Sequence, residues 1–264
     1  MKIAIVKLSA LGDIVHSMVV LQFIKSSYQQ IEIDWIVDER FKELLDFHPD
    51  INKVHVVRIK EAKQKKSLFL LLKELIKVSK LGPYDLVIDM QGLIKSAVIS
   101  RLIPSPITIG FDKSSSRESL SSVFYNKTFQ YSYKENIVER NFGLIKFALG
   151  LPSKKEEIIN KLPFLYSSEK YLVNNLSSLK KNILLIPSAS IISKRYSPIK
   201  LAELTTMLDA NYLIIWGNYE EKKLAEEVQA LSPKVNICDE LSIQVLISLI
   251  LQVDLDTCVL KLFF

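Results

Sequence analysis

The sequence predicts an α/β protein with two consecutive domains, each built around a mainly parallel sheet. Short apolar segments rich in β-branched residues alternate with longer segments whose apolar residues recur at helical spacing. Residues 151–181, rich in proline, serine and charge, interrupt this alternation, and a second strand-and-helix series follows. We therefore expect an N-terminal domain over 1–165 and a C-terminal domain over 180–264.

The N-terminal domain contains five expected strands, at 3–6, 31–37, 54–59, 86–90 and 107–111. The helical patterns lie between and after them, at 14–26, 40–47, 68–80, 93–103 and 135–149. Pro104 ends the fourth of these helices, and Gly150 is a plausible C-cap for the last.

The C-terminal domain repeats the scheme with strands at 182–187, 212–216 and 235–238 and the start of another at 253–255. Its helices begin at Ser197-Pro198, a favourable N-cap and N1 pair, and cover 220–231 and 243–252. Two Rossmann-like domains in tandem are typical of the GT-B glycosyltransferase architecture, in which they face one another across a cleft. Two unrelated doubly wound domains are the alternative.

Composition excludes several classes of protein. The chain has 264 residues, 48% of them hydrophobic and 24% charged, which is ordinary for a globular protein. Two cysteines form no disulfide framework and favour a reducing compartment, and three scattered histidines indicate no metal site. No uncharged apolar stretch reaches the roughly 18 residues of a membrane-spanning helix. With seven glycines and neither a Gly-x-Gly-x-x-Gly fingerprint nor a P-loop, a dehydrogenase or kinase is not expected.

The net charge of +6 has two interpretations. It provides solubility, or it serves an acidic partner such as anionic lipid, nucleic acid or a phosphorylated substrate. The basic segment 60–66 precedes the apolar segment 68–72 and is expected to be a charged loop entering a helix. Such a pair suits a membrane surface; a solvated loop before a core helix is the alternative.

Residues 2–18 carry the clearest functional signal. The first strand ends at a turn of small residues, where Gly12 and the single carboxylate Asp13 begin a helix. Ligands of open α/β sheets bind beyond the carboxyl ends of the strands. Asp13 is therefore a candidate general base, with Gly12 allowing close approach of a ligand. A carboxylate favoured by the helix N-terminus alone is the competing explanation.

Further polar residues follow other strands. Gln91 and Gly92 form the turn after the strand 86–90 and are candidates for binding a sugar or phosphate; a tight turn alone would also explain them. Arg117 and Arg140 could bind an anionic acceptor, although solvated arginines are common.

In the second domain, candidate donor-binding residues follow the first two strands. Ser188, Ser190 and Lys194 suit the pyrophosphate of a nucleotide-sugar. Glu221 suits ribose hydroxyls. A basic loop and a charged helix N-terminus are the alternatives.

Together these segments resemble the lipopolysaccharide heptosyltransferases, which are ADP-heptose transferases of glycosyltransferase family 9. The resemblance is strongest to the members that add the first heptose to the Kdo–lipid A inner core. It rests on the motifs 7–16, 89–96, 110–112, 117–120, 124–126, 138–140 and 216–217 with Lys194 and Glu221, and it covers residues 1–255.

The resemblance implies a role for each matching residue. Asp13 matches the general base. Ser188, Ser190, Lys194 and Glu221 match the donor-binding side. Gly12, Gln91, Gly92, Arg117 and Arg140 match the acceptor-binding side. The implied reaction is inverting transfer of L-glycero-D-manno-heptose from ADP-heptose to a Kdo hydroxyl, with no metal and no cofactor beyond the donor substrate.

The implied partners are the nucleotide-sugar, Kdo–lipid A and the anionic inner-membrane surface, with no nucleic acid. The implied location is the cytoplasm, peripheral on the cytoplasmic face of the inner membrane of a Gram-negative cell. The phosphates and carboxylates of such an acceptor would explain the net positive charge of the chain.

One segment departs from the family pattern. Members continue with an Asp-Thr-Gly…His motif that wraps the donor pyrophosphate, whereas here Cys258 follows Asp256 and Thr257 and no later histidine occurs. This predicts a C-terminally truncated second domain. The alternatives are a weakly active or inactive remnant that binds only acceptor, or a different heptosyltransferase of the same family.

Overall fold

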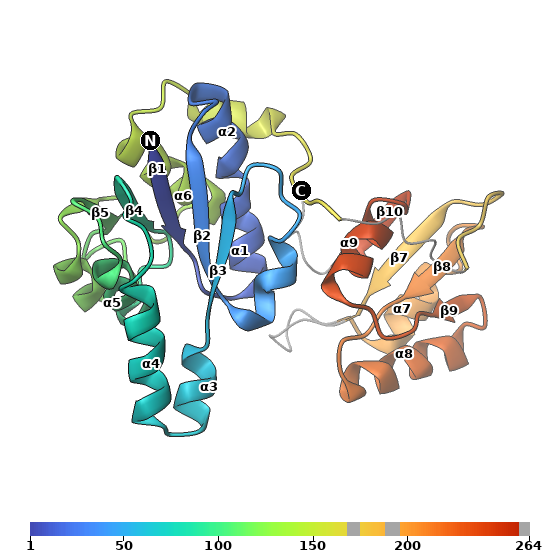
Figure 1. Ribbon diagram of the computed structural model, residues 1–264. Helices are drawn as coiled ribbons and strands as arrows, with labels where there is room; N and C mark the ends of the chain where they lie inside the picture. The colour runs from blue at the N-terminus through green and yellow to red at the C-terminus, as the bar shows by residue number, and fades with distance from the viewer. Residues whose placement is uncertain (168–174, 188–195, 259–264) are drawn as a thin grey trace. The chain divides into compact units, whose positions relative to one another are not determined.

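The computed structural model describes residues 1–167, 175–187 and 196–258, the side chains of 255–258 excepted. The chain forms two compact units, Met1–Leu165 and Tyr166–Phe264. Each unit contains its own parallel sheet with helices packed against it (Figure 1).

The first unit has a six-stranded parallel sheet in the order β3-β2-β1-β4-β5-β6. Its strands are β1 (Lys2–Val6), β2 (Glu32–Asp38), β3 (Lys53–Val57), β4 (Leu86–Asp89), β5 (Thr108–Phe111) and β6 (Lys127–Phe129). This is the strand order of the doubly wound Rossmann fold, whose direction reverses between β1 and β4. Residues Ile3 to Val6 have no exposed surface, which explains why this strand is an unbroken apolar run.

The helices of the first unit connect successive strands, except α6, which follows the last strand of the sheet (Figure 1). They are α1 (Leu11–Met18), α2 (Val20–Ser27), α3 (Ile59–Gln64), α4 (Leu68–Val78), α5 (Ile94–Leu102) and α6 (Ile137–Leu149). Three 3-10 helices, η1 (Glu39–Leu44), η2 (Ser119–Phe124) and η3 (Lys155–Asn160), complete it. The expected C-cap after α6 is confirmed, because Gly150 adopts a left-handed conformation with φ 66°.

The single helix expected at 14–26 is wrong, since two helices meet at Val19. Ser17 Oγ donates to the carbonyl of Asp13 at 2.7 Å and accepts from Asn141 Nδ2 at 3.0 Å. Back-bonding of a serine to the preceding turn bends helices. The charged loop expected at 60–66 is also wrong, because most of it forms α3. The helix expected at 40–47 is the 3-10 helix η1.

The second unit has a four-stranded parallel sheet in the order β10-β7-β8-β9. Its strands are β7 (Asn182–Ile186), β8 (Asn211–Ile214), β9 (Val235–Ile237) and β10 (Leu255–Cys258), and its helices are α7 (Pro198–Leu204), α8 (Tyr219–Leu231) and α9 (Ile243–Ile250). The predicted cap of α7 is confirmed, because Ser197 Oγ accepts from the Lys200 N–H at 3.4 Å. Among the described residues, no helix is long and apolar enough to cross a bilayer.

Candidate active site

The turns after β1 and β4 meet at the point where the strand order of the first sheet reverses. Gln91 joins them: its Oε1 accepts from the backbone N–H of Leu8 at 2.7 Å and of Ser9 at 3.3 Å. Its Nε2 donates to Ser9 Oγ at 3.2 Å. One carboxamide thus fixes the turn that leads to Asp13. The prediction that Gln91 also contacts an acceptor stays a prediction.

Asp89, the last residue of β4, holds the turn that follows this strand. It is fully buried, and its Oδ1 accepts from the N–H groups of Gln91 and Gly92 at 2.8 and 3.3 Å. Tyr125 donates its hydroxyl to Asp89 Oδ2 at 2.9 Å. Burial is the largest influence and raises the pKa of Asp89 above its ordinary value, although these hydrogen bonds oppose the rise. Gly92 has φ 67°, a backbone conformation that favours glycine.

Asp13 lies in the first turn of α1 and is exposed to solvent. Its Oδ2 accepts from the Ala10 N–H at 3.3 Å, so the carboxylate also serves the helix N-terminus. The two explanations of this residue therefore coexist in the fold. Gly12 is partly exposed beside it.

Lys7 is the residue that the sequence analysis missed. It directly follows β1, is only 4% exposed, and donates from Nζ to the Met90 carbonyl at 3.0 Å. Burial lowers its pKa, which the nearby charges of Asp13 and Asp89 raise. A lysine interrupting an otherwise buried apolar run was the available signal, because such a residue is rarely buried without a partner.

Arg140 is buried, unlike the solvated arginine that its sequence context allowed. Its guanidinium lies 4.8 Å from the ring centre of Phe111 and 4.6 Å from that of Tyr133, and Nη2 donates to the Ser115 carbonyl. Its Nε is buried without a hydrogen-bond partner among the described residues. Burial lowers the pKa of this guanidinium. Contact with two rings and the hydrogen bond to Ser115 restrict the orientation of the guanidinium.

These groups surround one cavity of about 100 Å³. Its polar lining includes Lys7, Ser9, Asp13, Gln91, Ser115, Arg117 and Arg140, with Met90, Leu93, Phe111, Tyr133 and Ile137 completing the wall. Three cationic side chains thus face a space that contains one carboxylate. Such a site can bind an anionic molecule and accept a proton from it.

In the second unit, Glu221 lies at the N-terminus of α8. Its Oε2 accepts from the Gly217 N–H at 2.7 Å, and its own N–H donates to Asn218 Oδ1 at 3.0 Å. This is the helix-terminal arrangement that the sequence left open, and contact with a ribose remains a prediction. The other predicted donor-binding residues, Ser188, Ser190 and Lys194, lie outside the described residues. No metal-binding group of histidine, cysteine, aspartate and glutamate occurs in the described part of the chain.

Comparison with solved structures identifies the fold. The Escherichia coli heptosyltransferase WaaC with ADP superimposes with a TM-score of 0.80 at 23% identity, covering 97% of this chain and 80% of that one. The E. coli ADP-heptose lipopolysaccharide heptosyltransferase II gives 0.70 at 20% identity, covering 95% and 76%. The predicted GT-B fold class is confirmed.

Comparison of sequences agrees. Lipopolysaccharide heptosyltransferase 1 of Campylobacter coli is 38% identical over 97% of this chain and 77% of its own length. The Pseudomonas aeruginosa protein of the same name is 34% identical over 58% of this chain and 44% of its own length. The model of glycosyltransferase family 9 (heptosyltransferase) matches residues 73–259. The chain therefore belongs to glycosyltransferase family 9, the heptosyltransferase family.

Proposed function

We propose that this protein transfers L-glycero-D-manno-heptose from ADP-heptose to a Kdo hydroxyl of the lipid A–Kdo inner core. Membership of the heptosyltransferase family and 38% identity to a lipopolysaccharide heptosyltransferase 1 support this assignment. The structural observation that carries it is the cavity in which Asp13 lies among Lys7, Arg117 and Arg140. An acceptor with Kdo carboxylates and phosphates has the opposite charge, and its hydroxyl needs a base.

The proposed chemistry is a single displacement. Asp13 takes the proton of the acceptor hydroxyl, whose oxygen forms a bond to the anomeric carbon of heptose. The bond from that carbon to the phosphate oxygen breaks, and its electron pair leaves with ADP. Attack opposite the leaving group inverts the anomeric centre. The donor is the only nucleotide required, so we expect no cofactor and no change in turnover on addition of a chelator.

Each remaining predicted residue has a place in this scheme. Arg117 and Arg140 hold acceptor anions and Gln91 contacts the acceptor from the cavity wall, whereas Gly12 and Gly92 lie in the turns beside that wall and let the acceptor approach the backbone. Ser188, Ser190 and Lys194 offset the charge that develops on the departing pyrophosphate, and Glu221 holds the ribose. The first domain is thus the acceptor side and the second the donor side. We propose that the reaction takes place at the anionic cytoplasmic face of the inner membrane, since the acceptor is a lipid.

The decisive experiment is transfer of radiolabelled heptose from ADP-heptose to Kdo–lipid A by the 264-residue chain, with the C. coli relative as a positive control. We expect label in the lipid fraction and inversion at the anomeric carbon. Acceptor binding without transfer would instead favour a protein that binds the acceptor only. Preference for an already heptosylated core over Kdo–lipid A would favour a later heptosyltransferase.

A further inference from the structure

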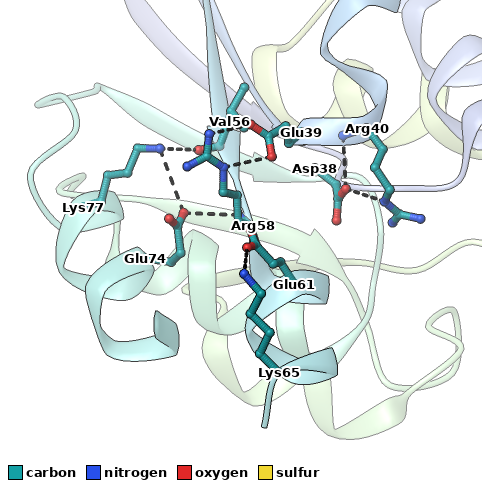
Figure 2. A network of polar contacts seen from close by, with 9 residues as sticks. All are labelled: Asp38, Glu39, Arg40, Val56, Arg58, Glu61, Lys65, Glu74 and Lys77. Atoms are coloured by element: carbon teal, nitrogen blue, oxygen red, sulfur yellow. Dashed lines mark hydrogen bonds and ion pairs between the residues drawn. The ribbon is translucent and has the colours of Figure 1, made fainter. Parts of the chain in front are cut away.

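The hairpin of α3 and α4 projects beyond the carboxyl end of β3 (Figure 1). Polar contacts hold it in place (Figure 2): the N–H of Arg58, between β3 and α3, donates to Glu74 Oε2 of α4 at 3.1 Å, and Arg58 Nε donates to Glu39 Oε2 of η1 at 2.8 Å. Lys77 Nζ donates to the Val56 carbonyl at 2.7 Å. Together with buried Val78, these contacts fix which side of α4 faces the protein.

The opposite side of α4 is apolar and exposed. Leu68, Phe69, Leu72 and Ile76 are 76, 75, 57 and 55% exposed. Their spacing places them on one face of the helix. Four large apolar side chains gathered on one exposed helix face differ from the scattered apolar residues of an ordinary surface and mark an interaction site.

The charge around this face is strongly positive. Residues 59–80 contain seven lysines against two glutamates. Lys65 pairs with Glu61 and Lys77 with Glu74. The other five have no ion-pair partner within the described part of the chain: Lys60, Lys63, Lys66, Lys73 and Lys80. An apolar helix face flanked by free lysines is the pattern of helices that lie in the interface of anionic bilayers.

A basic cavity lies between the hairpin and Lys95, next to the candidate active site. Its volume is about 600 Å³, and its lining includes Arg40, Lys60, Lys63, Lys66 and Lys95. Lys95 Nζ also approaches Ser9 Oγ, a wall of the Asp13 cavity, to 3.4 Å. The hairpin, this cavity and Asp13 all follow carboxyl ends of parallel strands, so they share one edge of the first unit.

We propose that the α3–α4 hairpin docks the protein on an anionic lipid bilayer, with the exposed face of α4 entering the boundary between headgroups and acyl chains. The lysines then contact lipid phosphates, and the edge that carries Asp13 faces the surface from which a lipid-linked acceptor emerges. This last step rests on the proposed function; the docking face does not. Pairing of two copies through the same face is disfavoured, since it would bring two sets of lysines together.

The test is co-sedimentation of the full chain with vesicles of phosphatidylethanolamine and phosphatidylglycerol, with phosphatidylcholine vesicles in parallel. We expect binding to the anionic vesicles only. Phe69→Glu with Leu72→Glu should weaken it about tenfold or more, because two apolar side chains no longer enter the interface. Ile159→Glu with Leu162→Glu is the control matched in charge, since these two side chains are 82 and 70% exposed outside the hairpin, and it should bind as wild type does. Far-ultraviolet circular dichroism verifies that each variant folds.

Equal vesicle binding by the double variant and wild type would overturn the proposal. The proposal would also be overturned if sedimentation equilibrium showed a dimeric wild type and a monomeric double variant, since the apolar face of α4 would then bind a second copy of the chain. Vesicle binding requires no turnover, so failure of heptose transfer leaves this result standing. Transfer to an acceptor stripped of its acyl chains should be equal in wild type and the double variant, which separates docking from chemistry.

Discussion

Gln91 Oε1 accepts the backbone N–H of Leu8 at 2.7 Å, joining two turns that lie 83 positions apart in the sequence. The same oxygen accepts from Ser9, so two N–H groups lose a partner if the side chain is removed. We expect Gln91→Ala to lower the free energy of unfolding by about 1–3 kcal/mol and to reduce kcat, because the turn leading to Asp13 loosens.

Gln91→Glu is the informative companion variant. It keeps an oxygen acceptor for Leu8 but loses the Nε2 donor to Ser9 Oγ. Urea unfolding should place its stability between wild type and Gln91→Ala. Wild-type stability in Gln91→Ala would contradict a structural role for this side chain.

Two substitutions at Asp13 separate its role at the helix N-terminus from its proposed role as general base. Asp13→Asn keeps an oxygen that can accept the Ala10 N–H, whereas Asp13→Ala removes both the acceptor and the base. We expect both variants to lose about 10²–10⁴-fold in kcat. Only the alanine variant should also lose about 1 kcal/mol of stability, measured by urea unfolding. Transfer by Asp13→Asn at the wild-type rate would leave the carboxylate as a helix cap alone.

Lys7 provides a test of charge in the cavity. Lys7→Met keeps the length of the side chain while removing a cation that lies 4% exposed. We expect kcat/KM for an anionic acceptor to fall by about 10²-fold. The free energy of unfolding should stay equal or rise, since replacing a buried charge by an apolar side chain is often neutral or stabilising. Lys113→Met, on an exposed residue outside the cavity, is the control and should leave kcat/KM unchanged.

Gly110 makes room for the tyrosine that supports Asp89. A Cβ at this position would lie 2.4 Å from Tyr125 Cε2, so the ring must move and its hydroxyl must leave Asp89 Oδ2. We expect Gly110→Ala to cost about 1–3 kcal/mol of stability and to lower kcat through the turn at Gln91. The double variant Gly110→Ala, Tyr125→Ala should lose much less free energy of unfolding than the sum of the losses in the two single variants. If the two losses simply add, the residues are not coupled.

Local sequence patterns predicted most strands of both units to within two residues, because the central strands β1, β2, β4, β7 and β8 are largely buried and rich in apolar residues. They missed α3, whose only buried residue is Ala62, and β6, a three-residue strand without a buried position. The contact of Gln91 with Leu8 and the hydrogen bond of Lys7 to the Met90 carbonyl were beyond local reasoning, although the position of Lys7 beside an apolar run signalled its burial. Both depend on β1 lying beside β4, which follows from strand order and not from neighbouring residues.

In the candidate site, too, local patterns predicted some features and only the fold reveals the others. Asp13, Gln91, Arg117 and Arg140 were selected from turns and helices far apart in the sequence, and the fold brings them to one cavity. The sequence could indicate which residues follow carboxyl ends of strands. It could not indicate that the Arg140 guanidinium lies against the rings of Phe111 and Tyr133, since these contacts require β5 to pack beside α6.

His48 makes stability depend on pH. It is 5% exposed, and its Nδ1 accepts the Asp50 N–H at 3.2 Å, which only the unprotonated nitrogen can do. Burial lowers the pKa of His48 from 6.5 to about 4. Between these values the unfolded chain binds more protons than the folded one, so the free energy of unfolding falls as the pH falls.

The whole contribution, about 3 kcal/mol, is present above pH 6.5 and is lost by about pH 4. His48→Asn keeps an acceptor for Asp50 but cannot be protonated. In urea unfolding from pH 7 to 4, the variant should therefore lose less stability than wild type, by up to that amount. Parallel curves for the two proteins below pH 6.5 would show that His48 is not the titrating group.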